Sequence, residues 1–241
     1  FGLFTHAVSP SCIIELGPGR PIGEPAEFIC PRPSRSAEDD YRVVIDPYGV
    51  SRVTLREMVD DPHVWPALAW GGRRDLALIR RLKQFETLEH LEKGGAANTR
   101  RGICPGDKKQ EQQAIKNKPI LKTESFPAGT FLYLDSDRLP INDDPYLHSR
   151  DSIDMSAFQL PQLIIKETWQ SVSARFAAAL VKSSAERGPV ICTRSYISVH
   201  APEPASVLDA ACLAFNSILA PYFFFLTSGR FASYRPEPPK K

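Results

Sequence analysis

The longest apolar run in the sequence covers residues 213–226, and Asn216, Ser217 and Pro221 interrupt it. A helix that crosses a bilayer needs about 20 consecutive residues that are mostly apolar. The run is too short and too polar for this role, so we expect it to form a buried helix. We therefore expect that the chain does not bind or cross a membrane.

Composition favours a globular protein of a reducing compartment. The chain has 241 residues, 42% hydrophobic and 24% charged, enough for one large domain or two small ones. Its cysteines are odd in number, widely spaced and without a CxxC pair: Cys12, Cys30, Cys104, Cys192 and Cys212. This pattern argues against a disulfide framework and a zinc site, and predicts a cytoplasmic location. The sequence starts at Phe1 without a signal peptide, and we expect it to be a piece of a longer chain.

The net charge of +2 hides an uneven distribution along the chain. Residues 1–69 sum to −4, residues 70–125 to +6, residues 126–159 to −4 and residues 160–241 to +4. Two basic segments of this size can attract a polyanion although the whole chain is nearly neutral.

The first third is expected to form strands and then helices. Residues 12–16, 27–30 and 42–46 are short apolar runs, and the Gly/Pro-rich turn between the first two predicts a hairpin. Thr54 and Glu57 have the spacing of a capping box at the start of a helix.

Helical periodicity is clearest in residues 73–85, where leucine, isoleucine and phenylalanine recur at every third position and the other face is basic. A second short helix over residues 87–93 is expected to end at Gly94–Gly95. Residues 98–122 are polar and basic, which predicts a loop with short strands. A strand over residues 130–134 and an acidic loop over residues 135–154 should follow.

The last third predicts a mixed sheet and one helix. Residues 163–166, 175–181 and 190–199 have the pattern of strands, and residues 207–219 that of a helix. The apolar face of this helix is expected to carry Leu208, Ala211, Phe215, Ile218 and Leu219. The predicted fold class is α+β, with mixed sheets and a few packed helices.

Two short segments each match part of a known sequence motif. Residues 13–19 end an apolar run in Glu15 and a glycine turn, as a cofactor-binding strand would, but Pro21 and Pro25 would break the helix required next. A hairpin turn explains this segment better. Residues 142–146 have Asp144 where an Asn/Asp-Pro-Pro-Tyr/Phe motif has proline, so we expect an acidic turn. The scattered histidines predict no metal site.

Several segments, in a fixed order, resemble the C-terminal half of bacterial adenine-N6 DNA methyltransferases of restriction–modification systems. They are Trp70-Gly71-Gly72-Arg73-Arg74-Asp75-Leu76, Thr99-Arg100-Arg101-Gly102-Ile103, Leu160-Pro161-Gln162-Leu163-Ile164-Ile165-Lys166 and Leu213-Ala214-Phe215-Asn216-Ser217-Ile218-Leu219-Ala220. The last leads into a tyrosine/phenylalanine run and Arg235-Pro236-Glu237. The resemblance covers most of the chain from Trp65 onward and, more weakly, residues 1–33.

The resemblance implies three regions. Residues 1–55 would be the strand-rich tail of an upstream catalytic domain, with a hairpin remnant. Residues 56–125 would be a helical, basic connecting region, and residues 126–241 a target-recognition domain. The methyl-donor and catalytic motifs are missing, so we expect the chain alone to be inactive and to bind no cofactor. The parent enzyme would use S-adenosylmethionine.

The implied partners are double-stranded DNA, the upstream catalytic domain and a specificity or restriction subunit. The expected DNA contacts are basic residues on loops and strand faces, because phosphate contacts position a protein and base contacts specify the sequence. They are Arg100, Arg101, Lys108 and Lys109 in the basic loop region, and Lys166, Arg175 and Arg194 on predicted strands. For any one of them taken alone, an ordinary solvated side chain is the stronger interpretation, because exposed lysines and arginines are common.

Two other hypotheses compete with DNA recognition. The chain could be a structural or protein-interaction domain that contacts partner subunits, in which case DNA affinity would not depend on salt. It could also be a self-sufficient methyltransferase, which would require Gly17–Arg20 to open a helix.

Overall fold

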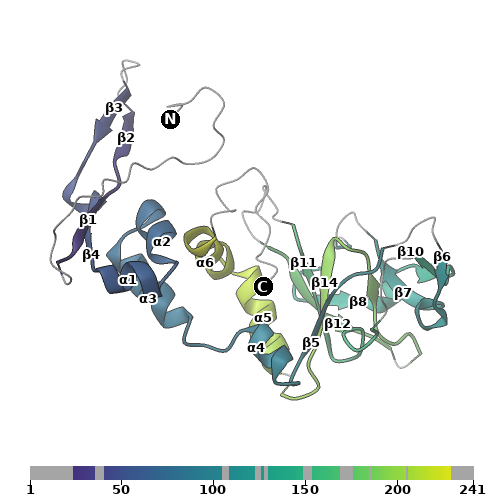
Figure 1. The fold of residues 1–241 in the computed structure, drawn as a ribbon. Coiled ribbons are helices and arrows are strands. Elements are labelled where there is room, and N and C mark those ends of the chain that lie inside the picture. Colours follow the sequence, from purple (N-terminus) through teal and green to yellow (C-terminus); the bar gives the residue numbers. More distant parts are fainter. Residues whose placement is uncertain are drawn as a thin grey trace. The chain divides into compact units, whose positions relative to one another are not determined.

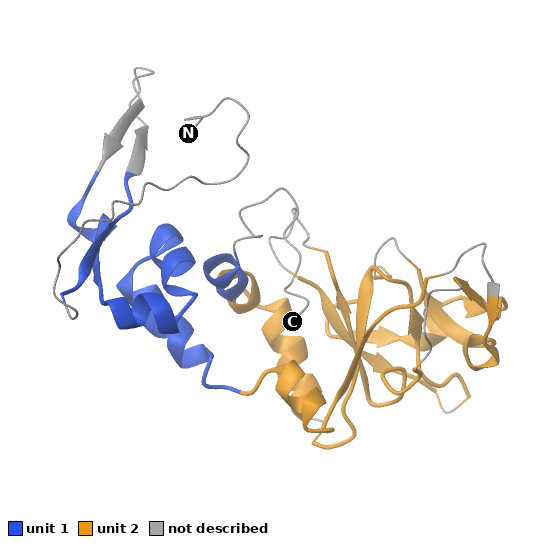
Figure 2. Cartoon of the chain, in the orientation of Figure 1, with its two compact units in different colours: residues 1–85, 223–236 blue, residues 86–222, 237–241 orange. Residues whose placement is uncertain are grey.

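The computed structural model describes residues 24–35, 41–104, 109–122, 126–127, 130–148, 154–168, 176–184, 186–204 and 206–228. These residues form an α+β protein with several sheets, as the sequence predicts. The chain divides into two compact units, which Figure 2 colours separately: unit 1 is residues 1–85 and 223–236, and unit 2 is residues 86–222 and 237–241. These boundaries differ from the divisions expected after residues 55 and 125.

In unit 1, two antiparallel strand pairs precede three helices (Figure 1). The strand pairs are β1 (Ala26–Ile29) with β4 (Val50–Val53), and β2 (Arg32–Arg35) with β3 (Tyr41–Val44). A 3₁₀ turn (Pro47–Gly49) leads into β4, and the helices are α1 (Leu55–Asp60), α2 (Val64–Trp70) and α3 (Arg73–Leu82). The predicted helix over residues 73–85 is confirmed, although it stops at Leu82. The predicted strand over residues 12–16, and with it the hairpin, lies outside the described residues.

The core of unit 1 is a cluster of apolar side chains from β4, α2 and α3: Val53, Val64, Ala67, Leu68 and Leu76. Phe28 of β1 and Met58 of α1 pack against it, and the Phe28 ring lies 5.7 Å from the ring of Trp65. Isolated helices of this length are marginal in water, so this packing is what holds them.

Charged hydrogen bonds join α1 to α3. Thr54 caps α1 with the predicted capping box: its hydroxyl accepts from the Glu57 amide, and the Glu57 carboxylate accepts from the Thr54 amide. The same carboxylate accepts from Arg73 at 3.0 Å and Arg80 at 3.1 Å, and Arg80 also donates to Asp61 at 2.9 Å. The Thr54 amide, with the two arginines, lowers the pKa of Glu57 to about 2.

Unit 2 is built around a five-stranded sheet with the order β5-β14-β11-β12-β8. Its strands are β5 (Asn98–Arg101), β8 (Tyr133–Asp135), β11 (Gln162–Lys166), β12 (Ala178–Lys182) and β14 (Tyr196–His200). β8 is parallel to β12 and the other neighbours are antiparallel, so the predicted mixed sheet is confirmed. The smaller sheets are β6 (Lys109–Glu111) with β10 (Tyr146–His148), and β7 (Lys118–Leu121) between β9 (Ile141–Asn142) and β13 (Ile191–Cys192). Two 3₁₀ turns cover Gln113–Ile115 and Ser136–Arg138.

Three further helices are α4 (Leu88–Lys93), α5 (Ser206–Asn216) and α6 (Leu219–Thr227). In Figure 1, α4 and α5 lie on one side of the five-stranded sheet, and the smaller sheets lie on the other. α4 begins at Thr87 and ends at Gly94, as predicted, and Gly95 takes the left-handed conformation (φ 73°) that favours glycine.

Alternation along the strands divides unit 2 into two cores. Leu163, Ile165 and Val199 face α5, where they pack with Leu208 and Cys212. Ile164 and Tyr196 point to the opposite face, where they pack with side chains of β7 and β13.

A buried polar network ties β11 to its surroundings. Gln162 donates through Nε2 to the carbonyl of Val190 and to Ser198 Oγ, both at 2.8 Å, and its Oε1 accepts from the Val190 amide at 2.9 Å. Ser198 in turn donates to the carbonyl of Ala157 at 2.6 Å. Satisfied polar groups of this kind fix one register of the sheet.

Two sequence expectations for the last third are wrong in detail. Residues 190–199 form two strands, β13 and β14, separated by a turn at Arg194 and Ser195. The helix expected over residues 207–219 ends at Asn216, and α6 begins at Leu219, whose side chain is 40% exposed. The run 213–226 is therefore not one buried helix. Within the described residues, no single helix is long and apolar enough to cross a membrane. The pair of α5 and α6 would reach the required length and apolar composition only together, and the two helices are bent by 74° relative to each other.

We predict that Glu57→Gln lowers the free energy of unfolding near pH 7 by about 1 kcal/mol, a small value because solvent screens this site. The pKa of Glu57 is about 2 in the fold and 4.5 ordinarily, so its ionised form stabilises unit 1 at neutral pH. This contribution should disappear as the pH falls from 4.5 to about 2. Urea unfolding at pH 7, 4 and 2.5, followed by tryptophan fluorescence, measures it.

The matched control is Asp60→Asn, which removes a carboxylate from the exposed pair with Arg56. It should change the free energy of unfolding by less than about 0.5 kcal/mol at every pH. If the loss in Glu57→Gln does not depend on pH, the carboxylate charge is not what stabilises the α1–α3 contact.

The break after Asn216 makes Phe215 and Leu219 unequal, whereas the sequence predicts that both belong to the core. Phe215 packs edge to face on Phe176, with ring centroids 6.2 Å apart, and against the α5 core. Phe215→Ala should therefore lower the free energy of unfolding by about 2–4 kcal/mol. Leu219→Ala should change it by less than about 0.5 kcal/mol, because Leu219 is exposed. Urea titrations of the two variants compare them, and equal losses would contradict this assignment.

Candidate nucleic-acid interface

Three strands from distant parts of the sequence meet at one end of the five-stranded sheet. In the register of β11 and β14, Lys166 lies opposite Tyr196, and the amide of Gly102, just after β5, donates to the Tyr196 carbonyl at 2.8 Å. The last residues of β5 and β11 therefore flank the first residue of β14. We call this region the basic end of the sheet, defined by Arg100, Arg101, Lys166 and Arg194.

Arg194 joins this end through its backbone. Its amide donates to the carbonyl of Ile103 at 3.1 Å, and the amide of Glu167 donates to the carbonyl of the next residue, Ser195, at 2.9 Å. The prediction that Arg194 lies on a strand is wrong, because it occupies the turn between β13 and β14. Four of the seven basic residues expected to contact DNA are thus brought together.

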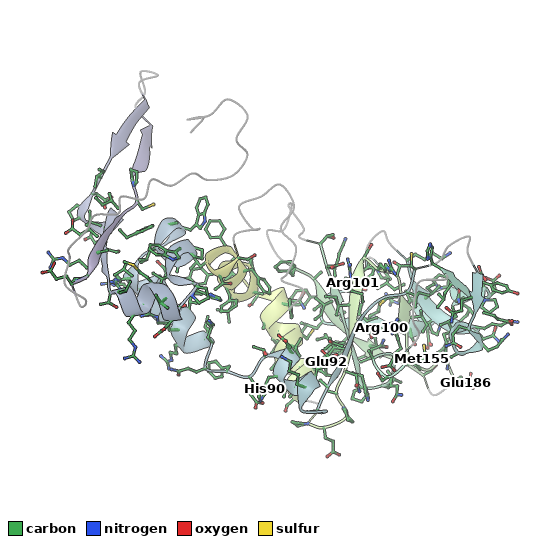
Figure 3. The ribbon with its side chains drawn as sticks, viewed as in Figure 1. His90, Glu92, Arg100, Arg101, Met155 and Glu186 are labelled. Atoms are coloured by element: carbon green, nitrogen blue, oxygen red, sulfur yellow. The ribbon has the colours of Figure 1, made fainter. Side chains whose placement is uncertain are left out.

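The register separates these residues onto two faces of the sheet. Arg100 pairs with Ser198 and Lys166 with Tyr196, so both side chains leave the sheet on the same face. Their Cα atoms are roughly 12 Å apart, because they lie two strands and two residues away from each other. Arg101 pairs with Ile197 and points to the opposite face. Figure 3 labels the two arginines side by side on β5.

Arg101 is held by an ion pair within the fold. Its guanidinium contacts the carboxylate of Glu167, whose side chain is only 5% exposed, while the Arg101 side chain is 44% exposed. A buried carboxylate needs a partner, and an arginine satisfies it while keeping other N–H groups for solvent or a ligand. The pair fastens the end of β5 to the residue that follows β11.

Arg100 lies near the carboxylate of Asp154, which belongs to the connection that leads into β11. Asp154 accepts from the amide of Ser156 at 2.9 Å, and this hydrogen bond, with the charge of Arg100, lowers the pKa of Asp154. Asp154 therefore stays ionised and partly offsets the positive potential at Arg100.

Gly102 permits the close approach of β5 to the turn before β14. The sequence analysis did not identify this role. A Cβ atom at Gly102 would lie 2.2 Å from the carbonyl oxygen of Thr193 and 2.3 Å from that of Cys192. A side chain does not fit there, so the chain after Arg101 can approach the turn before Arg194 only with glycine at position 102. Sequence reasoning also missed Glu167, because its partner Arg101 lies 66 positions earlier and no local pattern indicates the pair.

The other three residues expected to contact DNA are not among the described residues of the basic end of the sheet. Lys108 and Arg175 lie outside the described residues. The backbone of Lys109 lies in β6, opposite His148 of β10, and thus in a different sheet.

The segment 142–146 forms a turn between β9 and β10, as expected. The Asn142 side chain donates to the carbonyls of Ile115 at 3.0 Å and Asp144 at 2.8 Å, and the amide of Tyr146 donates to the Asp144 carboxylate. Both Asn142 contacts are internal, so the amide that would hold a substrate base in a methyltransferase here serves the turn. The segment 13–19 lies outside the described residues.

We predict that Arg101→Met lowers the free energy of unfolding by about 1–3 kcal/mol, because it leaves the Glu167 carboxylate buried without its partner. Adding Glu167→Gln should restore most of the loss, since an uncharged amide costs less to bury. Urea unfolding of the wild type, both single variants and the double variant gives the coupling energy. If the losses of the single variants simply add, the pair does not support the basic end of the sheet.

The sequence matches no model of a known protein family, and no curated protein matches it. The resemblance to methyltransferases is therefore supported only by the short segments quoted above. The convergence of Arg100, Arg101, Lys166 and Arg194 is an independent observation, because it follows from strand pairing alone.

Proposed function

We propose that the chain recognises double-stranded DNA as the target-recognition part of an adenine-N6 DNA methyltransferase of a restriction–modification system. The observation that carries this proposal is the basic end of the sheet. β5 lies more than 60 residues before β11 in the sequence, yet strand pairing with β14 brings four basic residues within a few strand widths of one another. Cations gathered in this way attract the phosphate backbone, which supplies most of the non-specific affinity for DNA.

The spacing of these cations allows contacts to separate phosphates of a duplex. The side chains of Arg100 and Lys166 leave the same face of the sheet with Cα atoms roughly 12 Å apart, about the width of the major groove. Both side chains are partly exposed at the rim of this face, beside the buried Tyr196. Arg194 extends the positive surface from the adjoining turn, where an arginine can reach either a phosphate or a guanine edge.

The proposal assigns recognition to this chain and the chemistry to another part of the same enzyme. S-adenosylmethionine would supply the methyl group there, and extrusion of the adenine would take place there too. The chain would contact that catalytic part and a specificity or restriction subunit. The strand-rich first region would be the tail of the catalytic domain.

A protein-interaction domain is the second candidate, and one feature of unit 2 favours it. β8 is an edge strand of the five-stranded sheet, and two aromatic side chains on or beside it, Phe131 and Tyr133, are largely exposed. An edge strand with exposed aromatic residues is suited to pairing with a partner chain.

Fluorescence anisotropy with a labelled duplex over a salt series tests the proposal. The logarithm of the wild-type affinity should fall linearly with the logarithm of salt concentration, by about 0.9 per phosphate contacted. The variant Lys166→Gln/Arg194→Gln should bind more weakly, with a slope smaller by about 1.8 if each residue neutralises one phosphate.

The matched control is Lys182→Gln/Arg138→Gln, which removes two positive charges from β12 and the turn after β8, at the opposite end of the sheet. Its slope should equal that of the wild type. No binding by the wild type at low salt, or a slope unaffected by Lys166 and Arg194, would favour the protein-interaction domain instead.

A further inference from the structure

Helix α3 carries four arginines in two adjacent pairs, Arg73–Arg74 and Arg80–Arg81, which are separated by two helical turns. The first arginine of each pair is bound within unit 1. Arg73 donates to Glu57, and Arg80 donates to Glu57 and Asp61. These two arginines hold α3 against α1.

The second arginine of each pair faces solvent. Successive residues of a helix are about 100° apart, so Arg74 and Arg81 project within about 20° of each other, opposite the face of Leu76 and Ile79. Leu76 and Ile79 are buried in unit 1, whereas Arg74 and Arg81 are exposed. Within the described part of the chain, no ion pair involves either outward arginine.

The outward face is shaped for an extended anion. Seven residues of helix place Arg74 and Arg81 about 10.5 Å apart along the axis. Between them lie Ala77 and Leu78, and the Leu78 side chain is 40% exposed. About three nucleotides of one DNA strand, at 3.4 Å each, cover the same length.

We infer that the outward face of α3, formed by Arg74, Ala77 and Arg81, is a second DNA-backbone contact, located in unit 1 and separate from the basic end of the sheet in unit 2. This inference rests on the proposed function and extends it to a surface that the resemblance does not assign to DNA.

A lipid surface fits this face less well. A helix that lies on a membrane inserts an apolar face between the lipids and keeps its basic residues at the rim of that face. The apolar side of α3, Leu76 and Ile79, is already packed in the core of unit 1. The face that remains carries two arginines and one exposed apolar side chain, Leu78, which is too little apolar surface for insertion between lipids. The two charges are what a contact to the DNA backbone uses.

The test compares the full chain with its Arg74→Gln/Arg81→Gln variant by fluorescence anisotropy on the same labelled duplex. The slope of log affinity against log salt should decrease by about 1.8, and the affinity at 50 mM salt should fall about tenfold or more. The loss should be the same for duplexes of unrelated sequence, because phosphate contacts carry no base information. Thermal unfolding should be unchanged, since neither side chain is packed.

The matched control is Arg52→Gln/Arg56→Gln, which removes two positive charges from exposed positions of the same unit. Both arginines lie beside an acidic partner, Glu27 or Asp60. This variant should keep the wild-type slope. A salt-dependent wild type whose slope is unaffected by Arg74→Gln/Arg81→Gln would overturn this inference and leave the proposed function standing.

Two further outcomes are decisive. A wild type that does not bind duplex even at low salt overturns both proposals. Binding to phosphatidylserine vesicles that exceeds binding to the duplex, and that is lost in Arg74→Gln/Arg81→Gln, would assign the face to membranes and overturn the inference.

Discussion

The backbone hydrogen bonds on both edges of β14 are the constraint on which the arrangement of unit 2 depends. They place β5 on one side and β11 on the other, so that residues 98–101 and 162–166 become neighbours although the sequence separates them widely. The buried Gln162–Ser198 hydrogen bond fixes the register between β11 and β14. A slip by one residue would turn Lys166 to the helix-covered face and Ile165 away from its core, so a single register sets both the packing and the position of the charges.

Acidic residues decide which arginines are available to a ligand. Two pairs of adjacent arginines occur on α3, at positions 73–74 and 80–81, and in each pair the first member is tied to a carboxylate of the fold. In the pair 100–101 on β5, Arg101 is tied to Glu167 and Arg100 lies near Asp154. Glu57 binds Arg73 and Arg80, and Glu167 binds Arg101. The other member points to a different side, because neighbouring residues diverge by about 100° on a helix and by about 180° on a strand. A paired arginine can therefore anchor an element while its neighbour faces solvent or a different partner.

The elements that the sequence predicts correctly are those set by local chemistry. The capping box at Thr54 and Glu57, the period of α3 and the glycine stop of α4 depend on residues a few positions apart. The wrong predictions depend on distant contacts. The turn at Arg194 exists because the chain there approaches Gly102, which lies 92 positions earlier. α5 stops at Asn216, whose amide donates to the carbonyls of Ala178 at 2.7 Å and Cys212 at 2.9 Å. The apolar periodicity of residues 207–219 cannot predict the hydrogen bond between Asn216 and β12, because it reflects only contacts along the helix.

The expected regions of the chain differ from its compact units for a related reason. A division after residue 125 would assign β5 to a connecting region and β14 to the recognition domain, yet the two strands form one continuous ladder. Residues 126–241 alone would expose the edge of β14 and lack Arg100, Arg101 and Gly102. Unit 1 likewise contains residues from both ends of the chain, because the Trp70 ring packs 5.2 Å from the ring of Phe225. A segment that folds and carries the basic end of the sheet therefore has to begin before β5. One that carries the outward face of α3 has to include the elements that pack with α3, from β1 to α2, and the second half of α6.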